Sequence, residues 1–160
     1  YDLMTTIDFT PAAINLTEVK AFCRVDGSAD DSLLTFLYNA ACDEALSFAQ
    51  VVVGVATVTV VTNWEDTLYL PFWPIGAVTY VKVDGVADTE YTLLNGKLTP
   101  SVEGEKLEVV YAAGWNTSTP KDVMHAIYQR VKYGFDYGDD LLQPTPRFFD
   151  RVLYRYKNTL

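Results

Sequence analysis

Residues 43–60 have the sequence DEALSFAQVVVGVATVTV, and the spacing of the apolar residues changes within this stretch. Ala45 and Phe48 continue steps of three and four residues that begin at Leu33, which is typical of a helix face. From Val51 onward valine and threonine dominate, and these branched residues favour strands. The change near residue 50 therefore predicts an α+β protein in which helices surround an antiparallel β region.

A helical hairpin is predicted upstream of this change. Asn15 and Glu18 have the spacing of a capping box that opens the first helix, and Gly27 is its expected end. The second helix is expected to open at Ser28, with two aspartates in its first turn. Its predicted apolar stripe consists of Leu33, Leu37, Ala40, Ala41 and Phe48, with Leu34 and Ala45 beside it.

The β region is predicted to cover roughly residues 51–114 and to contain five or six short antiparallel strands. Asp84-Gly85 and Asn95-Gly96 are dipeptides typical of two-residue hairpin turns. A helix is predicted to follow, with Thr119 as its N-cap and Pro120 at its first position. Its inward residues are expected to be Val123, Ile127, Val131 and Phe135, flanked by Met124 and Tyr128.

Residues 144–160 are predicted to form an amphipathic extension of a single α+β domain that covers residues 1–143. After the spacer Pro144–Pro146, apolar residues follow helical spacing on one side: Phe148, Phe149, Val152, Leu153, Tyr156 and Leu160. Arg147, Arg151 and Arg155 lie on the opposite side, and their repulsion weakens an isolated helix. The helix therefore needs a partner, which could be this chain's own core or another subunit.

Charge and hydropathy exclude several classes of function. The 160 residues carry a formal net charge of −9, which disfavours non-specific binding to nucleic acid phosphates. The extension holds four basic residues and Asp150, so it is basic (+3) on an acidic body (−12), and self-assembly would bring the two together. The longest apolar stretch, 51–61, is too short for a membrane helix, and no signal peptide is expected at the N-terminus.

Cysteine, histidine and carboxylate residues give no catalytic pattern. Cys23 and Cys42 lie in apolar surroundings and are expected to be reduced, packed thiols. His125 has no second histidine to share a metal and is expected to lie on a helix face near Asp122. The acidic turn at 136–140 lacks the ligand positions of a calcium loop. We therefore expect no metal, no cofactor and no enzymatic activity.

Six segments carry a resemblance to a known family. They are NLTEVKAFCRVDGSADDSLLTFLYNAACDEALSF (15–48), LYLPFWPIGAVTYVKVDG (68–85), YTLLNGKLTP (91–100), LEVVYAAGW (107–115), PKDVMHAIYQRVKYGFDYGDD (120–140) and RFFDRVLYRYKN (147–158). In this order the chain resembles the head–tail connector proteins of long-tailed bacteriophages, also called head-completion or adaptor proteins. The YGFDYGDD segment departs from the family pattern, so no contacts are carried over for residues 135–142.

The resemblance implies a structural virion protein. Its copies would form a ring of about twelve subunits beneath the portal protein, in the head–tail neck of a virion assembled in the bacterial cytoplasm. The ring would extend the channel, let DNA pass without specific binding, and present a surface to a neck, tail-completion or stopper protein. By analogy the portal-binding residues are Phe148, Phe149, Arg151, Val152, Leu153, Arg155 and Tyr156.

Two other interpretations remain open at this stage. The first is a monomeric or low-order neck or baseplate accessory that binds carbohydrate or protein through Trp64, Trp73 and Trp115. Exposed tryptophan faces would favour it, and tryptophans packed between sheet and helices would not. The second is a small hydrolase that uses Glu65, Asp66 or the acidic residues of 136–140, although paired acids need a defined separation across a cleft.

Overall fold

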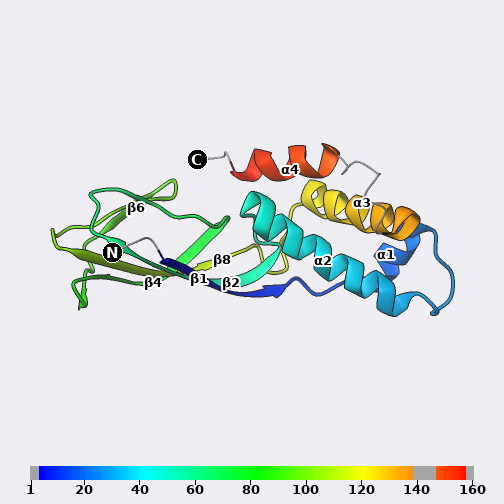
Figure 1. Cartoon of the computed structure of the whole chain (residues 1–160), viewed down its shortest axis with the longest axis horizontal. Coiled ribbons are helices and arrows are strands. Elements are labelled where there is room, and N and C mark those ends of the chain that lie inside the picture. Colours follow the sequence, from blue (N-terminus) through cyan, green and yellow to red (C-terminus); the bar gives the residue numbers. More distant parts are fainter. Residues whose placement is uncertain (1–3, 139–146, 158–160) are drawn as a thin grey trace.

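The computed structural model describes residues 4–138 and 147–157. The molecule is elongated, with the strands gathered at one end and the helices at the other (Figure 1). Helices and antiparallel sheets occur in comparable amounts, so the prediction of an α+β fold is confirmed. Among the described residues, no helix is long and apolar enough to cross a lipid bilayer.

The larger sheet is antiparallel and has the strand order β1-β2-β8-β4-β5. Its strands are β1 (Met4–Pro11), β2 (Gly54–Asn63), β8 (Lys106–Ala113), β4 (Ile75–Val83) and β5 (Val86–Ala87). β1 was not predicted, yet it pairs along its whole length with β2, from Met4 opposite Val61 to Pro11 opposite Gly54. A segment far from the β region in sequence therefore forms the edge of its main sheet.

A second, three-stranded sheet covers part of the first. It consists of β3 (Leu68–Tyr69), β7 (Lys97–Thr99) and β6 (Thr92–Leu94), in that order. Leu70 and Leu98 are buried together with Val58, Val109 and Tyr111 of the larger sheet, which forms one apolar core between the two. Residues 51–114 thus hold seven strands, one more than the upper end of the predicted five or six, and the additional one is β5, which is only two residues long.

Both predicted hairpin turns are confirmed. Asp84-Gly85 connects β4 to β5, and Asn95-Gly96 connects β6 to β7, with the flanking residues directly paired. All four turn residues have a positive φ between 50° and 79°, which is the backbone geometry of a type I′ turn. The Asp84 carboxylate also accepts hydrogen bonds from the backbone N–H groups of Glu105 and Lys106, at 3.0 and 2.8 Å.

The helical end contains α1 (Leu16–Cys23), α2 (Asp31–Ala49), α3 (Lys121–Tyr137) and α4 (Arg147–Lys157). α2 and α3 lie side by side, and α1 and α4 each pack against both of them (Figure 1). The inward residues Val123, Ile127 and Val131 of α3 are buried as predicted. Gly134 is buried too. α2 comes so close to it that a Cβ at this position would lie 3.1 Å from Leu37 Cδ2.

Several predicted helix ends are displaced. The Asn15 side chain caps α1 as expected and accepts from the Glu18 N–H at 3.2 Å. The predicted end at Gly27 is wrong, because Arg24 adopts φ 57° and closes the helix with its N–H on the carbonyl of Ala21. α2 begins at Asp31 instead of Ser28. α3 begins at Lys121 with Pro120 as its N-cap, one residue later than predicted.

The predicted stripe of α2 is confirmed at Leu34, Ala41 and Ala45 and wrong at three other positions. Leu33 and Phe48 are 45% and 48% exposed, and Ala40 is exposed as well. The residues that face the core are Leu34, Tyr38, Ala41, Cys42, Ala45 and Ala49. Both sets have helical spacing, but the alanines and the cysteine of the second let α2 approach α3 closely, which bulkier residues would prevent.

The two ends of the molecule are joined at a pair of glycines. Gly54 of β2 and Gly114, just after β8, have φ 142° and 110°. A Cβ on Gly114 would collide with the carbonyl oxygen of Gly54, so neither strand could approach the other here with a larger residue. Beside them, Trp73 exchanges backbone hydrogen bonds with Gln50 and Val52 at 3.0 and 2.7 Å, which links the end of α2 to the sheet.

Candidate functional site

The C-terminal helix α4 is docked on the chain's own helical core. Val152 and Leu153 are 3% and 0% exposed and belong to the apolar cluster formed with α2 and α3. The sequence left open whether this face packs on the same chain or on another subunit. The structure shows that these two residues pack on the same chain, so in this conformation their side chains are not available to another protein.

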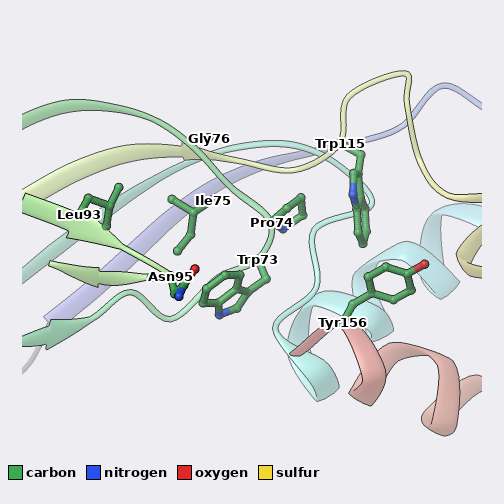
Figure 2. A pocket seen from close by; sticks show the side chains of 9 residues that line it. Trp73, Pro74, Ile75, Gly76, Leu93, Asn95, Trp115 and Tyr156 are labelled. Carbon is green, nitrogen blue, oxygen red and sulfur yellow. The ribbon is translucent and has the colours of Figure 1, made fainter. Parts of the chain in front are cut away.

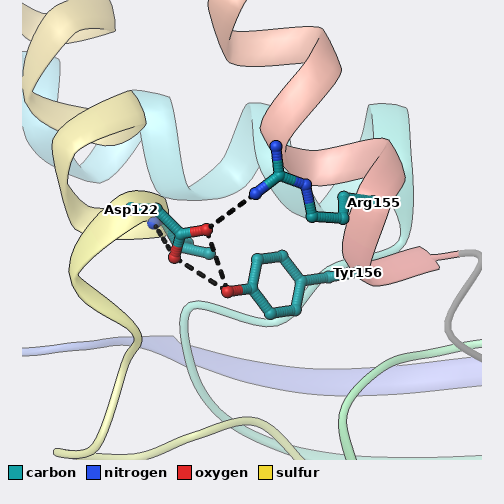
Figure 3. Close-up of polar contacts among 4 residues, drawn as sticks. Asp122, Arg155 and Tyr156 are labelled. Atoms are coloured by element: carbon teal, nitrogen blue, oxygen red, sulfur yellow. Dashed lines mark hydrogen bonds and ion pairs between the residues drawn. The ribbon is translucent and has the colours of Figure 1, made fainter.

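One acidic residue holds the last turns of α4. The Tyr156 hydroxyl donates to both Asp122 oxygens, at 2.8 and 3.0 Å, and Arg155 Nη1 lies 3.6 Å from Asp122 Oδ2 (Figure 3). Partial burial and the hydrogen bond to this carboxylate raise the pKa of Tyr156. Asp122 stands in the first turn of α3, where sequence alone identifies it as an ordinary helix-start acid. Its role in docking α4 was therefore missed.

The opposite side of α4 is basic and open. Arg151 is exposed, and the Arg155 side chain is 67% exposed despite its contact with Asp122. Tyr154 packs edge-on against Phe48 of α2, with ring centroids 5.6 Å apart. Phe148 and Phe149 lie within α4, but their side chains are outside the described part of the structure, as are Pro144–Pro146 and Leu160.

A cavity of about 420 Å³ lies between the sheet end and α4 (Figure 2). It is lined by Trp73, Pro74, Ile75, Gly76, Leu93, Asn95, Gly96, Trp115 and Tyr156. Trp115 meets the Tyr156 ring in an edge-to-face arrangement, with centroids 5.3 Å apart and an interplanar angle of 87°. Tyr156 therefore contributes to this wall as well as binding Asp122, which connects the cavity to the docking of α4.

The three tryptophans do not form one exposed platform. Trp64 donates from Nε1 to the Val102 carbonyl at 2.9 Å, and it follows β2 at the end remote from the cavity, about 30 Å along the strand. Trp73 packs on the turn at Gly96, where a Cβ would collide with the indole. Trp115 is half-buried against Tyr156. This arrangement disfavours a carbohydrate site built from the three rings.

The polar residues considered for catalysis are dispersed. Glu65 and Asp66 are exposed, and Asp136 is paired with Lys132 at 2.9 Å on one face of α3, while Asp139 and Asp140 lie outside the described residues. Within residues 4–138 and 147–157, no group of three or more His, Cys, Asp or Glu side chains could hold a metal ion. His125 is exposed and packs edge-on against Phe22 at 5.5 Å.

The two cysteines are buried and free, as predicted. Burial raises the pKa of both thiols, that of Cys42 to about 12. Because the thiolate is the nucleophilic form, neither sulfur is activated for attack. They pack in the helical core together with Val19 and Tyr38.

This architecture, an antiparallel β end joined to a bundle that is closed by a C-terminal helix, also occurs in solved structures. No family model matches the chain, and no curated protein matches it. Chains in three structures of gene transfer agent (GTA) particles share the fold.

One of these structures is the virion of a native GTA particle, with a TM-score of 0.75 at 16% identity over 96% of this chain and 94% of that one. Another is the neck of an empty GTA particle computed with C6 symmetry, with a TM-score of 0.72 at 16% identity over 94% of both chains. The third is the neck of a native GTA particle computed with C12 symmetry, with a TM-score of 0.66 at 15% identity over 94% of both chains. The TM-scores show a common fold that extends over nearly the whole chain, and at 15–16% identity the comparison shows the fold alone.

Proposed function

We propose that this chain is a structural virion protein of the neck of a phage-like particle, where identical copies form a ring-shaped adaptor between the portal and the neck or tail. The observation that carries this proposal is the fold shared, over 94% of both chains, with neck chains from particles computed with C6 and C12 symmetry. The resemblance of the six sequence segments to head–tail connectors supports the same role independently of the coordinates.

The electrostatics suit a wall around moving DNA. The net charge of −9 gives a surface that does not hold phosphates, so a double helix could pass through the lumen without specific binding. In this proposal the protein has no catalytic activity. Copies fold in the bacterial cytoplasm and join the virion, where the ring extends the channel and presents a surface to a stopper or tail-completion protein.

The helix α4 is the proposed portal-facing element. Its outward arginines, Arg151 and Arg155, are placed to contact an acidic surface on the portal, since both extend from the open side of the helix. Val152, Leu153 and Tyr156 hold the helix in position for this contact. Phe148 and Phe149 complete the proposed binding segment at its first turn.

Quantitative mass spectrometry of purified particles tests the proposal directly. Counting this chain against the portal protein should give near-equal copy numbers. Absence of the chain, or a number that follows the capsid or the tail tip, would overturn the adaptor role. Arg151→Glu should reduce incorporation of this chain into particles severalfold while the chain stays folded. Lys97→Glu makes an equal charge change at an exposed position of β7 and should not reduce incorporation.

A further inference from the structure

The outer face of α2 carries three exposed apolar residues among polar ones, and nothing in the described part of the chain covers them. Phe36 is 68% exposed and Leu33 is 45% exposed, and exposed Ala40 lies one turn further along. Phe36 is two positions from both Leu34 and Tyr38, which are fully buried, so it points 160–200° away from them at about 100° per residue. A phenylalanine exposed to this extent on a helix surface is a candidate for contact with another protein.

An apolar groove lies between α1 and α3. Its volume is about 610 Å³, and its lining includes Ala21, Phe22, Lys121, Met124, His125 and Tyr128. Phe22 contacts the rings of His125 and Tyr128, with centroids 5.5 and 5.8 Å apart, and the Tyr128 hydroxyl donates to Glu18 at 2.8 Å. These contacts fix the walls of the groove in the isolated chain, so it is formed before any partner arrives.

The exposed apolar residues Leu33, Phe36 and Ala40 form a ridge on α2, and this ridge and the groove face away from each other. His125 is two positions from both Val123 and Ile127 of α3, which are buried, just as Phe36 is two positions from buried residues of α2. Because α2 and α3 pack together through their buried sides, the two outer sides point in nearly opposite directions. In a ring of about twelve copies, the two surfaces that meet at each contact must lie about 150° apart on one subunit, which this arrangement approximates.

The charges beside the two surfaces are complementary. Asp43 lies seven residues after Phe36 on the same side of α2 and is exposed. Lys121 stands at the rim of the groove and is exposed too. Within the described part of the chain, neither residue takes part in an ion pair. A contact between the two surfaces would therefore bring opposite, unpaired charges together.

We propose that the ridge of Leu33, Phe36 and Ala40 on one copy inserts into the α1–α3 groove of the next copy, with Asp43 facing Lys121. The contact is heterologous, because each copy offers its ridge to one neighbour and its groove to the other, and repetition closes a ring. This inference rests on the proposed ring function and assigns the surfaces that form it.

Cysteine cross-linking in assembled particles tests this contact. The full-length double variant Asn39→Cys/Ala21→Cys, which keeps Phe36 and uses an exposed position one turn from it, is incorporated into particles and treated with a short bis-maleimide, and the products are separated on a denaturing gel. We expect a ladder of covalent multimers of this chain. Each single variant should give no ladder, and neither should Thr57→Cys/Ala21→Cys, which moves one cysteine to the exposed face of β2. Cys23 and Cys42 are buried and remain in place.

Charge reversal supplies a second, independent readout. Asp43→Lys and Lys121→Asp should each lower incorporation into particles severalfold, and the double variant should restore it, because only the double variant places opposite charges in contact again. Loss in the double variant equal to the combined losses of the singles would count against the pairing.

The outcomes separate this inference from the function on which it rests. If the chain is present at the portal's copy number but the double cysteine variant gives no ladder, the assigned surfaces are wrong and the ring adaptor stands. The same conclusion follows if Asn39→Cys cross-links to a different virion protein. If particles contain none of this chain, the proposed function itself fails.

Discussion

The outer face of the large sheet mixes threonines and an aspartate with Met4 and Val55, whereas the outer face of α2 exposes the larger ring of Phe36 beside Leu33. Thr6, Asp8 and Thr57 are exposed on the strands, and Leu33 and Phe36 are exposed on α2. An antiparallel sheet can expose one face to water and needs no second layer of protein on that face. Phe36, at 68% exposed, has no aromatic counterpart of similar exposure among the described residues of this sheet face, so the comparison supports placing the proposed assembly surfaces on the helices.

The interiors of the two ends differ as well. The sheet core lies between two sheets whose strands are all fixed by backbone pairing, and it is filled mainly by valine and leucine. The helical core uses alanine, cysteine and Gly134 for close approach and is closed by two residues of a short final helix, Val152 and Leu153. The stability of the helical end therefore depends on the docking of α4, whereas the sheet core does not include this helix.

The largest expected effect comes from breaking that docking. Leu153→Ala removes a fully buried side chain and should lower the free energy of unfolding by about 2–5 kcal/mol, measured by urea denaturation followed by circular dichroism. Arg151→Ala, on the exposed side of the same helix, should change it by less than about 0.5 kcal/mol. Equal effects of the two substitutions would contradict the docked position of α4.

A hydrogen bond inside the sheet core should give the next effect. Tyr111 Oη accepts from the Phe72 N–H at 2.9 Å, and the Tyr111 side chain is fully buried. Tyr111→Phe leaves that N–H without its acceptor and should cost about 1–3 kcal/mol at neutral pH. A cost well below this range would mean that water reaches the Phe72 backbone.

Alkaline pH tests the same residue in another way. Burial raises the pKa of Tyr111 to about 12 in the folded chain, against about 10 when unfolded. A raised folded pKa means that its contribution is fully present below pH 10 and is lost as the pH rises toward 12, by about 1.4 kcal/mol per unit. Other buried tyrosines contribute to this loss, so Tyr111→Phe should make the decline shallower without abolishing it. An unchanged slope would contradict the assignment.

A smaller effect is expected at the contact between α4 and α3. Tyr156→Phe removes the donor to Asp122 and keeps the ring that packs on Trp115, so the loss should be about 0.5–1.5 kcal/mol. Near-ultraviolet circular dichroism should retain the tryptophan signal, because the ring contact persists. A loss as large as that of Leu153→Ala would show that the hydroxyl, and not the apolar face, holds the helix.

The smallest effect on stability is predicted for the ridge. Phe36→Ser should change the free energy of unfolding of the isolated chain by less than about 0.5 kcal/mol, because the side chain is mostly in water. The same substitution should strongly reduce incorporation into particles. A large destabilisation of the monomer would place Phe36 in a core and remove the contrast between the two ends of the molecule.

Much of the fold could be predicted from local patterns. The Asn15 cap, the turns at Asp84-Gly85 and Asn95-Gly96, and the buried stripe of α3 follow from signals within a few residues. β1 was missed although Thr6–Thr10 alternates polar and apolar residues, because the segment is short and pairs with a strand more than forty residues away. Edge strands of this kind depend on their partner more than on their own sequence.

The site shows a different limit. Periodicity correctly marked α4 as an amphipathic helix that needs a partner, yet it could not choose between partners. On α2 the predicted set was too wide, because it combined the buried Leu34, Ala41 and Ala45 with the exposed Leu33, Ala40 and Phe48. Apolar residues on two sides of one helix give no local rule for choosing between them, and here the packing of α2 against α3 decides. The sequence is ambiguous because α2 carries apolar residues on two sides, and the ridge is exposed for the same reason.

The late position of α4 in the chain has a consequence for synthesis. Every strand has been translated once residue 113 is made, but the helical core is incomplete until Leu153, about forty residues later. At about 5–20 residues per second, the ribosome takes roughly 2–8 s to cover that distance. During this interval the surface of α2 that α4 will cover is open to nearby nascent chains, and so is that of α3 once it has been made, so the helical bundle is completed later than the sheet.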